Sequence, residues 1–284
     1  MEGEAIRGDD ACWVCRSKQG LVKCLDCFGG HLTCRECCVL SHQNNPYHRV
    51  EIWNGSLFLR SSLYKLGFVL YLGHGGRRCP CMVEDENIWE DVDADPVTGF
   101  CPDDWQEVPD KKVRKGPENT LIIVNSLGVF RHRIGWCQCP GAQDHSMQLF
   151  HDSLFPASLE NPSSAFTFAV LDHFYIDAME CKTAAHSFFR KLCRMTNNAF
   201  PNNVPVRPDT FYIIISYAQP FSKNRYRELM RISRQWRDLL ARKRFGFGHD
   251  TDRISAAGDL ALFCPACPQP GINLPDDWQT SSDP

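Results

Sequence analysis

The chain has 284 residues, 43% of them hydrophobic, and a formal net charge of −3. This length allows two or three compact units, and the net charge excludes attraction to nucleic acid except through local patches. The first residues lack the pattern of a signal peptide, and no apolar run approaches the roughly 18 residues of a membrane span. We therefore expect an intracellular protein with no membrane partner.

Sixteen cysteines require a role in such a protein. Disulfides are rare in reducing compartments, where spaced thiols usually bind metal or do redox chemistry. The cysteines are grouped, and seven of them lie between Cys12 and Cys38. Metal binding is the interpretation that this grouping favours.

Residues 10–50 hold four ligand pairs with short spacers. A C-x2-C pair places two thiolates on one ion, and a tetrahedral zinc needs a second pair. Interleaved pairs then predict two zinc ions in a cross-brace. The predicted ligands of the first ion are Cys12, Cys15, Cys34 and Cys37, and those of the second are Cys24, Cys27, His42 and His48.

The order of these ligands resembles that of B-box-type fingers, whose last pair is also two histidines. A RING finger places a histidine in the middle, so a RING-like ubiquitin ligase is the weaker alternative. His31 and Cys38 fall outside the pairs and are expected to be a surface histidine and a buried thiol. Full sets of four ligands leave no open position for catalysis, so both sites are expected to be structural.

Three further segments follow this module. Residues 51–82 are apolar and aromatic and are expected to pack against it. Residues 83–118 read as an acidic and polar loop, since 84–95 carry seven acidic residues and no basic one. Residues 119–284 begin with a hairpin whose turn is Asn125–Gly128 and continue with a helical period from Ser146 to Asn198. We expect an α+β, zinc-rich fold: a B-box-like module, a β-hairpin and a mainly helical domain.

Further half-sites are dispersed along the chain. Cys137 and Cys139 form a C-x-C pair at the end of the hairpin, and Cys264 and Cys267 a C-x2-C pair near the C-terminus. We expect these two pairs to converge on one or more further zinc ions. The half-site of His74 and Cys79 is expected close by.

Several short motifs, taken in their order along the chain, resemble those of a known family. They include Leu72-Gly-His-Gly-Gly, Trp136-Cys-Gln-Cys, Glu180-Cys-Lys-Thr, Asn224-Arg-Tyr-Arg-Glu-Leu and Cys264-Pro-Ala-Cys-Pro-Gln-Pro-Gly. Together they resemble the CxC-type cysteine cluster associated with KDZ (Kyakuja-Dileera-Zisupton) transposases. The resemblance implies a zinc-chelating module that lies N-terminal to a transposase catalytic domain in fungal mobile elements.

The sequence departs from that pattern in three ways. It stops soon after Trp278, where members of the family continue into the catalytic domain. Residues 207–222 look inserted, as an extra strand or a retained intron. Cys81 and Cys101 fall where the family has no expected ligand, so we leave them out of the predicted sites.

The sequence shows no recognisable set of catalytic residues. It lacks the G-x-S-x-G elbow and the P-loop, and the acids of residues 84–95 belong to the predicted loop. We therefore expect no enzyme and no small-molecule substrate.

One basic segment, residues 222–244, carries nine Lys or Arg residues. Helical spacing places Arg227, Arg231 and Arg234 on one face, from which guanidinium groups can contact DNA phosphates. We predict a DNA-associated, nuclear recognition or scaffold module of a transposase-like protein. The alternative is a B-box-like module for protein–protein interaction, with other proteins or a transposase catalytic subunit as the expected partner.

Overall fold

A computed structural model gives the structure of the protein. It describes residues 11–82, 119–198, 201, 204 and 223–248, and short stretches at 253–256, 258–260, 267–269, 272–274 and 277–279. Two predicted segments lie outside the described residues: the loop 83–118 and the apparent insertion 207–222. Cys101 and Cys264 lie outside them too. The chain divides into two compact units, Met1–Ser233 and Arg234–Pro284.

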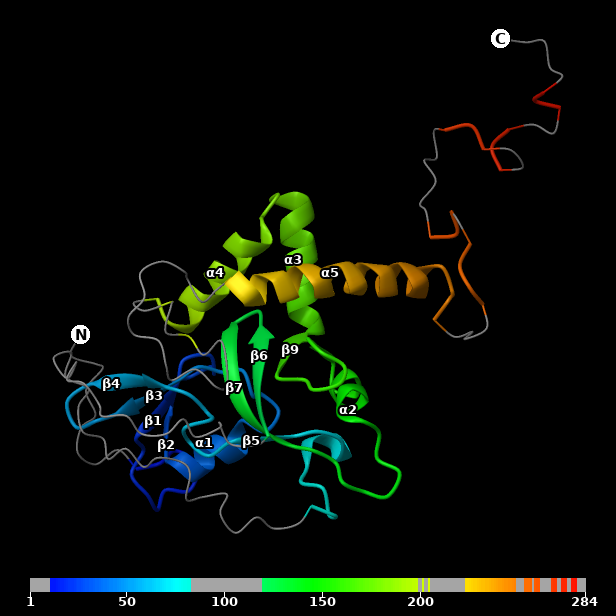
Figure 1. Ribbon diagram of the computed structural model, residues 1–284. Helices are drawn as coiled ribbons and strands as arrows, with labels where there is room; N and C mark the ends of the chain where they lie inside the picture. The colour runs from blue at the N-terminus through cyan, green and yellow to red at the C-terminus, as the bar shows by residue number, and fades with distance from the viewer. Residues whose placement is uncertain are drawn as a thin grey trace, which may run out of the picture. The chain divides into compact units, whose positions relative to one another are not determined.

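The N-terminal part of the first unit is a small antiparallel sheet with one short helix (Figure 1). The strand order is β2-β1-β3-β4, and the helix α1 follows β2 in the chain. Buried Val22, Val50, Leu63 and Phe68 form its core. The elements are β1 (Val22–Cys24), β2 (Leu32–Thr33), α1 (Arg35–Ser41), β3 (Val50–Trp53) and β4 (Phe58–Ser61).

The predicted hairpin is present. β6 (Thr120–Asn125) pairs antiparallel with β7 (Gly128–Gly135), and Asn125 is opposite Gly128. The Asn125 side chain accepts a hydrogen bond from the Leu127 backbone N–H at 2.9 Å, which closes the turn. Gly128 has a positive φ of 148°, and a Cβ there would overlap Thr196, so the position needs glycine.

The larger sheet has five strands in the order β5-β7-β6-β9-β8. β5 (Val69–Tyr71) runs parallel to β7, and β9 (Ser164–Thr167) runs parallel to β6, whereas β8 (Leu154–Pro156) is antiparallel to β9. The fold is therefore mixed α and β, as expected. The continuous helical period expected from Ser146 to Asn198 is wrong, because two strands interrupt it and Phe166 lies in β9.

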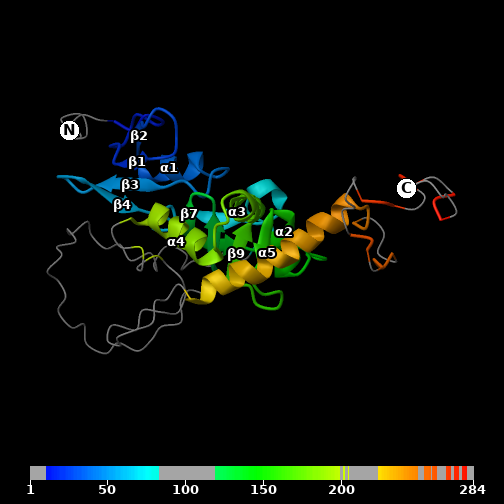
Figure 2. The same ribbon diagram turned by 90° about the horizontal axis from the view of Figure 1, so that it is seen from above.

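Helices α3 and α4 lie beside this sheet (Figures 1 and 2). α4 packs beside β7, and the Glu228 side chain of α5 accepts a hydrogen bond from Ser164 of β9 at 3.2 Å. The helices are α2 (His145–His151), α3 (Phe168–Glu180), α4 (Ala185–Thr196) and α5 (Lys223–Arg244), with a 3-10 turn, η1, at His74–Gly76. None of the described helices combines the length and the hydrophobicity of a membrane span.

The second unit begins inside α5. Trp236 and Phe247 are buried aromatic residues in the described part of this unit, and the Arg253 guanidinium lies 4.3 Å from the centre of the Phe247 ring. The remaining described stretches are turns and extended chain.

Among the described residues of the first unit, His132 is buried with both ring nitrogens unpaired. His132 of β7 is 1% exposed, and neither ring nitrogen has a hydrogen bond. Its ring lies 5.6 Å from that of Phe68 and 5.9 Å from that of Tyr47, centre to centre. Burial lowers the pKa of His132 from 6.5 to about 4, so the ring is neutral in the folded protein.

We predict that His132→Leu stabilises the protein in acid. The unfolded chain binds a proton at His132 below pH 6.5, whereas the folded chain does so only near pH 4. Stability is therefore lost as the pH falls between these values, by roughly 3 kcal/mol for this residue. Urea denaturation of both proteins from pH 7 to pH 4.5 should show a stability difference that grows as the pH falls; a constant difference would contradict the prediction.

Candidate metal centre

Cysteine and histidine side chains converge in three groups among the described residues. In each group four ligand atoms lie within 4.8 Å of one another. The first quartet is Cys12, Cys15, Cys34 and Cys37; the second is Cys24, Cys27, His42 and His48; the third is His74, Cys79, Cys137 and Cys139.

The first two quartets alternate along the chain. A pair of the first quartet is followed by a pair of the second, then again by one of each. Each quartet therefore joins two pairs that have a pair of the other quartet between them in the chain. α1 connects them, because Cys37 lies within the helix and His42 is its C-terminal cap. The convergence agrees with the interleaved pairing expected from the spacing, while likeness to a B-box remains a hypothesis.

The distances in these quartets suit tetrahedral coordination. Two sulfurs that share a zinc ion lie about 3.8 Å apart, because each Zn–S bond is about 2.3 Å. The Sγ atoms of Cys15 and Cys34 are 4.0 Å apart, and the Cys24 Sγ lies 3.2 Å from His42 Nε2. The Cys27 Sγ lies 3.3 Å from His48 Nδ1.

One of the two histidines of the second quartet, His42, is oriented for metal binding. His42 Nδ1 lies 2.8 Å from the Cys38 carbonyl, to which its N–H donates, so Nε2 faces the sulfurs with its lone pair. Hydrogen bonding with the Cys24 sulfur raises the pKa of His42 to about 11, and a bound cation would take the place of the proton that this pKa puts on Nε2. Cys38 is thus buried, as expected, and it also fixes a ligand.

Sheet topology explains the third quartet. β5 leads into the loop that carries His74, and β7 leads into Cys137. Because the two strands are parallel, their carboxyl ends meet at one edge of the sheet. Gly73 has a φ of 76°, which bends the chain between β5 and His74.

The contacts within the third quartet are equally short. His74 Nε2 lies 3.3 Å from the Cys137 Sγ and 3.5 Å from the Cys139 Sγ. Cys79 and Cys139 have their Sγ atoms 3.6 Å apart. The Gln138 backbone N–H donates to the Cys79 sulfur at 3.4 Å and lowers the pKa of that thiol to about 6, so the thiolate form that binds metal is favoured.

The third quartet differs from the convergence that we expected. His74 and Cys79 supply the second pair, and this set of four needs no ligand from Cys264 or Cys267. Cys264 lies outside the described residues, and Cys267 is exposed in the second unit. A metal-binding role for that C-terminal pair stays a prediction.

Supporting contacts were not predicted from the sequence. Asp26, between Cys24 and Cys27, accepts hydrogen bonds from the Arg49 side chain and from its backbone N–H at 2.6 Å. Gln148 of α2 clamps Cys137: its oxygen accepts from the Cys137 N–H at 2.9 Å, and its amide donates to the Cys137 carbonyl at 3.2 Å. Only the position of Asp26 between two ligands was a signal in the sequence.

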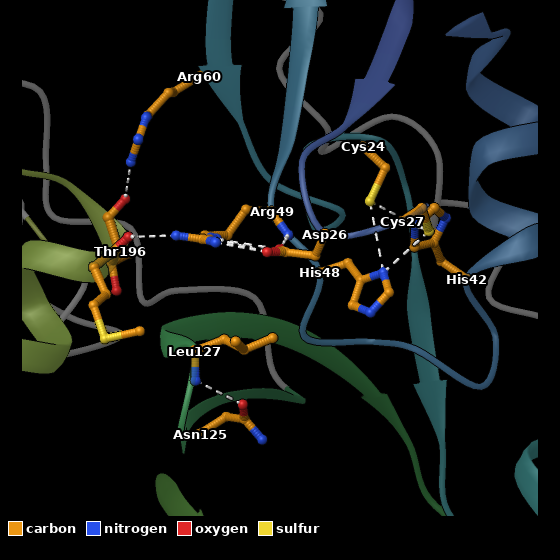
Figure 3. A network of polar contacts seen from close by, with 11 residues as sticks. Cys24, Asp26, Cys27, His42, His48, Arg49, Arg60, Asn125, Leu127 and Thr196 are labelled. Atoms are coloured by element: carbon orange, nitrogen blue, oxygen red, sulfur yellow. Dashed lines mark hydrogen bonds and ion pairs between the residues drawn. The ribbon is translucent and has the colours of Figure 1, made fainter. Parts of the chain in front are cut away.

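Arg49 also connects the second quartet to a distant helix (Figure 3). Its guanidinium pairs with Asp26 at 2.6 Å and donates to the Met195 carbonyl of α4 at 3.4 Å. Arg60 donates to the neighbouring Thr196 carbonyl at 2.9 Å. Two cations therefore cap the C-terminal end of α4, where carbonyl groups lack helical partners.

The predicted basic residues lie on α5. Arg227, Arg231 and Arg234 are all exposed, and Arg231 donates a hydrogen bond to the Ala157 carbonyl.

Comparison with protein families identifies the class of this module. Residues 109–200 match the family described as CxC2 like cysteine cluster associated with KDZ transposases. The matched segment contains Cys137 and Cys139, the hairpin and helices α2 to α4. The resemblance seen in the sequence is confirmed for this segment, which matches a KDZ transposase-associated cysteine cluster, a cysteine-rich type of module that is not itself catalytic.

No curated protein and no solved structure matches the chain. The three quartets could hold metal ions, which is consistent with zinc in a cysteine cluster.

Proposed function

We propose that the protein is a zinc-stabilised recognition and scaffold module of a transposase-like protein, and that it associates with DNA without performing chemistry. The observation that carries the proposal is the convergence of three Cys/His quartets in a chain whose residues 109–200 match a transposase-associated cysteine cluster. In this proposal each quartet holds one zinc ion. Zinc would supply cross-links between distant chain segments, since four protein ligands leave no position for water.

The chain's own residues support a structural role for the ions. The quartets fix α1, the loop after β5 and the end of β7. The ligands are oriented by hydrogen bonds that the Cys38 carbonyl and the Gln148 side-chain oxygen accept and that the Gln138 N–H donates. These contacts position protein surfaces. DNA association is supported by exposed Arg227 and Arg234 in a protein of negative net charge.

A test of this function uses the purified full chain and a labelled duplex of random sequence. We expect binding that weakens as salt rises, because phosphate contacts release counterions. Removal of metal by a chelator should abolish binding, and zinc, but not magnesium, should restore it. Binding that survives complete metal removal would contradict a zinc-stabilised module, and strand cleavage in the presence of magnesium would contradict a non-catalytic one.

A protein-binding role is the second candidate. Apolar side chains are exposed on the N-terminal module: Phe28 fully, Leu40 at 70% and Val14 at 57%. Exposed apolar groups of this size are typical of protein interfaces when they are contiguous. Lack of duplex binding at low salt, together with binding to a transposase catalytic subunit that Phe28→Ser and Leu40→Ser abolish, would favour this role.

A further inference from the structure

The outward side of α4 is a polar surface that the proposed function does not yet use. Phe188, Phe189 and Leu192 are buried on the inner side of the helix. The opposite side is exposed and follows spacings of three and four residues, which place its members on one face. A shallow hollow there is lined by Ser187, Arg190, Lys191, Arg194, Met195 and Asn198, which we call the α4 face.

The α4 face carries a local excess of positive charge. Lys191 is paired with Asp177 at 2.6 Å. Arg190 and Arg194 are exposed, and no described carboxylate lies within ion-pair distance of either. Their guanidinium groups are therefore available to an anionic ligand, in a chain whose net charge is −3.

Arg60 extends this charge beyond the helix. It is exposed and donates to the Thr196 carbonyl at the end of α4, with no described carboxylate in ion-pair distance. Arg49, the other cation at this end, is neutralised by Asp26. Figure 3 shows both side chains directed toward the same end of the helix.

We propose that the α4 face binds the phosphate backbone of duplex DNA. This inference rests on the DNA association proposed above and assigns it to a particular surface. Arg190 and Arg194 are one turn apart, about 6 Å along the helix axis, and their long side chains can reach neighbouring phosphates. Ser187 and Asn198 flank them with neutral hydrogen-bond donors.

The composition of the α4 face distinguishes DNA from other partners. Met195 is the one apolar side chain among its lining residues, so the face lacks the apolar centre of a protein interface. A membrane-surface helix needs an exposed apolar side, whereas the apolar side of α4 is in the core. Guanidinium, hydroxyl and amide groups all donate hydrogen bonds that phosphate oxygens can accept, so phosphate is the ligand that suits this set of side chains.

The surface is also held in place. The Thr196 hydroxyl accepts a hydrogen bond from the Val129 N–H at 2.8 Å and donates to the Leu192 carbonyl at 2.9 Å. With Arg49 and Arg60, these bonds fix the end of α4 to the hairpin and to the loop of the second quartet. Arg190 and Arg194 thus project from a helix that is anchored at its C-terminal end.

The test compares duplex binding by the full chain and by Arg190→Gln/Arg194→Gln in fluorescence anisotropy over a range of salt concentrations. Two lost phosphate contacts should weaken binding roughly tenfold at low salt and flatten the salt slope by about two, equally for unrelated sequences. Arg35→Gln/Lys65→Gln is the matched control, because it removes two exposed positive charges elsewhere. The control should retain the parent affinity and slope.

Three results would overturn the inference in different ways. If the parent binds and the α4 variant binds equally well, while Arg227→Gln/Arg231→Gln/Arg234→Gln binds weakly, the DNA surface is on α5 and the proposed function stands. If the control loses as much affinity as the α4 variant, the effect is net charge and not a site. If the parent binds no duplex at low salt but binds polyglutamate through Arg190 and Arg194, the partner is an acidic protein and DNA association fails as well.

Discussion

Substituting Ser for Cys34 is expected to unfold the N-terminal module. Cys34 is 5% exposed and contributes to the first quartet from the N-terminal cap of α1, so its loss removes a ligand and frees the helix that leads to His42. Binding of a structural zinc is worth about 10–16 kcal/mol in small modules, more than this sheet can replace from its own core. We expect loss of both ions of the module.

Two measurements check this result. Native mass spectrometry should show two fewer zinc ions in Cys34→Ser than in the parent, and hydrogen exchange should show unprotected amides in β1 and β3. Cys181→Ser is the control, since Cys181 is an exposed thiol outside the quartets. A variant that loses one ion and keeps its protected amides would show that the two sites are independent and would contradict the interleaved module.

The Arg49→Met substitution is expected to weaken the second quartet without touching a ligand. The Asp26 carboxylate is 11% exposed and its partner Arg49 29%. Burial raises the pKa of Asp26, and the hydrogen bonds from Arg49 outweigh this and lower it. Loss of the guanidinium leaves a nearly buried carboxylate without its counter-charge, and we expect a loss of about 2 kcal/mol of stability.

The Arg49→Met substitution should also lower the metal affinity of the second quartet. Asp26 lies between ligands Cys24 and Cys27, and Arg49 follows ligand His48, so this ion pair orients the ligand loops. Changes of such supporting contacts typically lower metal affinity about 10–100-fold. Competition with a chromogenic chelator should show this for Arg49→Met and no change for Lys18→Met, whose ion pair with Glu36 is exposed on both sides. Equal affinities in both variants would rule out the role of Arg49.

The local features of this fold were predictable from the sequence. The turn at Asn125–Gly128 follows from its residues, and the C-x2-C spacing with two final histidines predicts which pairs converge in the first two quartets. Both are short-range patterns, in which residue type and spacing decide the geometry. The buried position of Cys38 was also expected.

Long-range pairing was not predictable in the same way. That β5 runs parallel to β7 brings His74 and Cys79 to Cys137 and Cys139, and a sequence alone does not show which strands are neighbours. The strands at Leu154–Pro156 and Ser164–Thr167 were hidden because they are short and fully buried, so they lack the alternation of half-buried strands. Arg49 reaches Met195 across 146 residues, a contact without any local signal.

Anomalous X-ray scattering at the zinc edge, from crystals of the protein purified without added metal, tests the central claim most directly. We predict three peaks within the part of the chain that the structure describes, one at the centre of each quartet. Each peak should lie about 2.3 Å from its sulfur ligands and about 2.0 Å from its histidine nitrogens. A quartet without a zinc peak, or with its cysteines joined in a disulfide, would contradict the zinc-stabilised module proposed here.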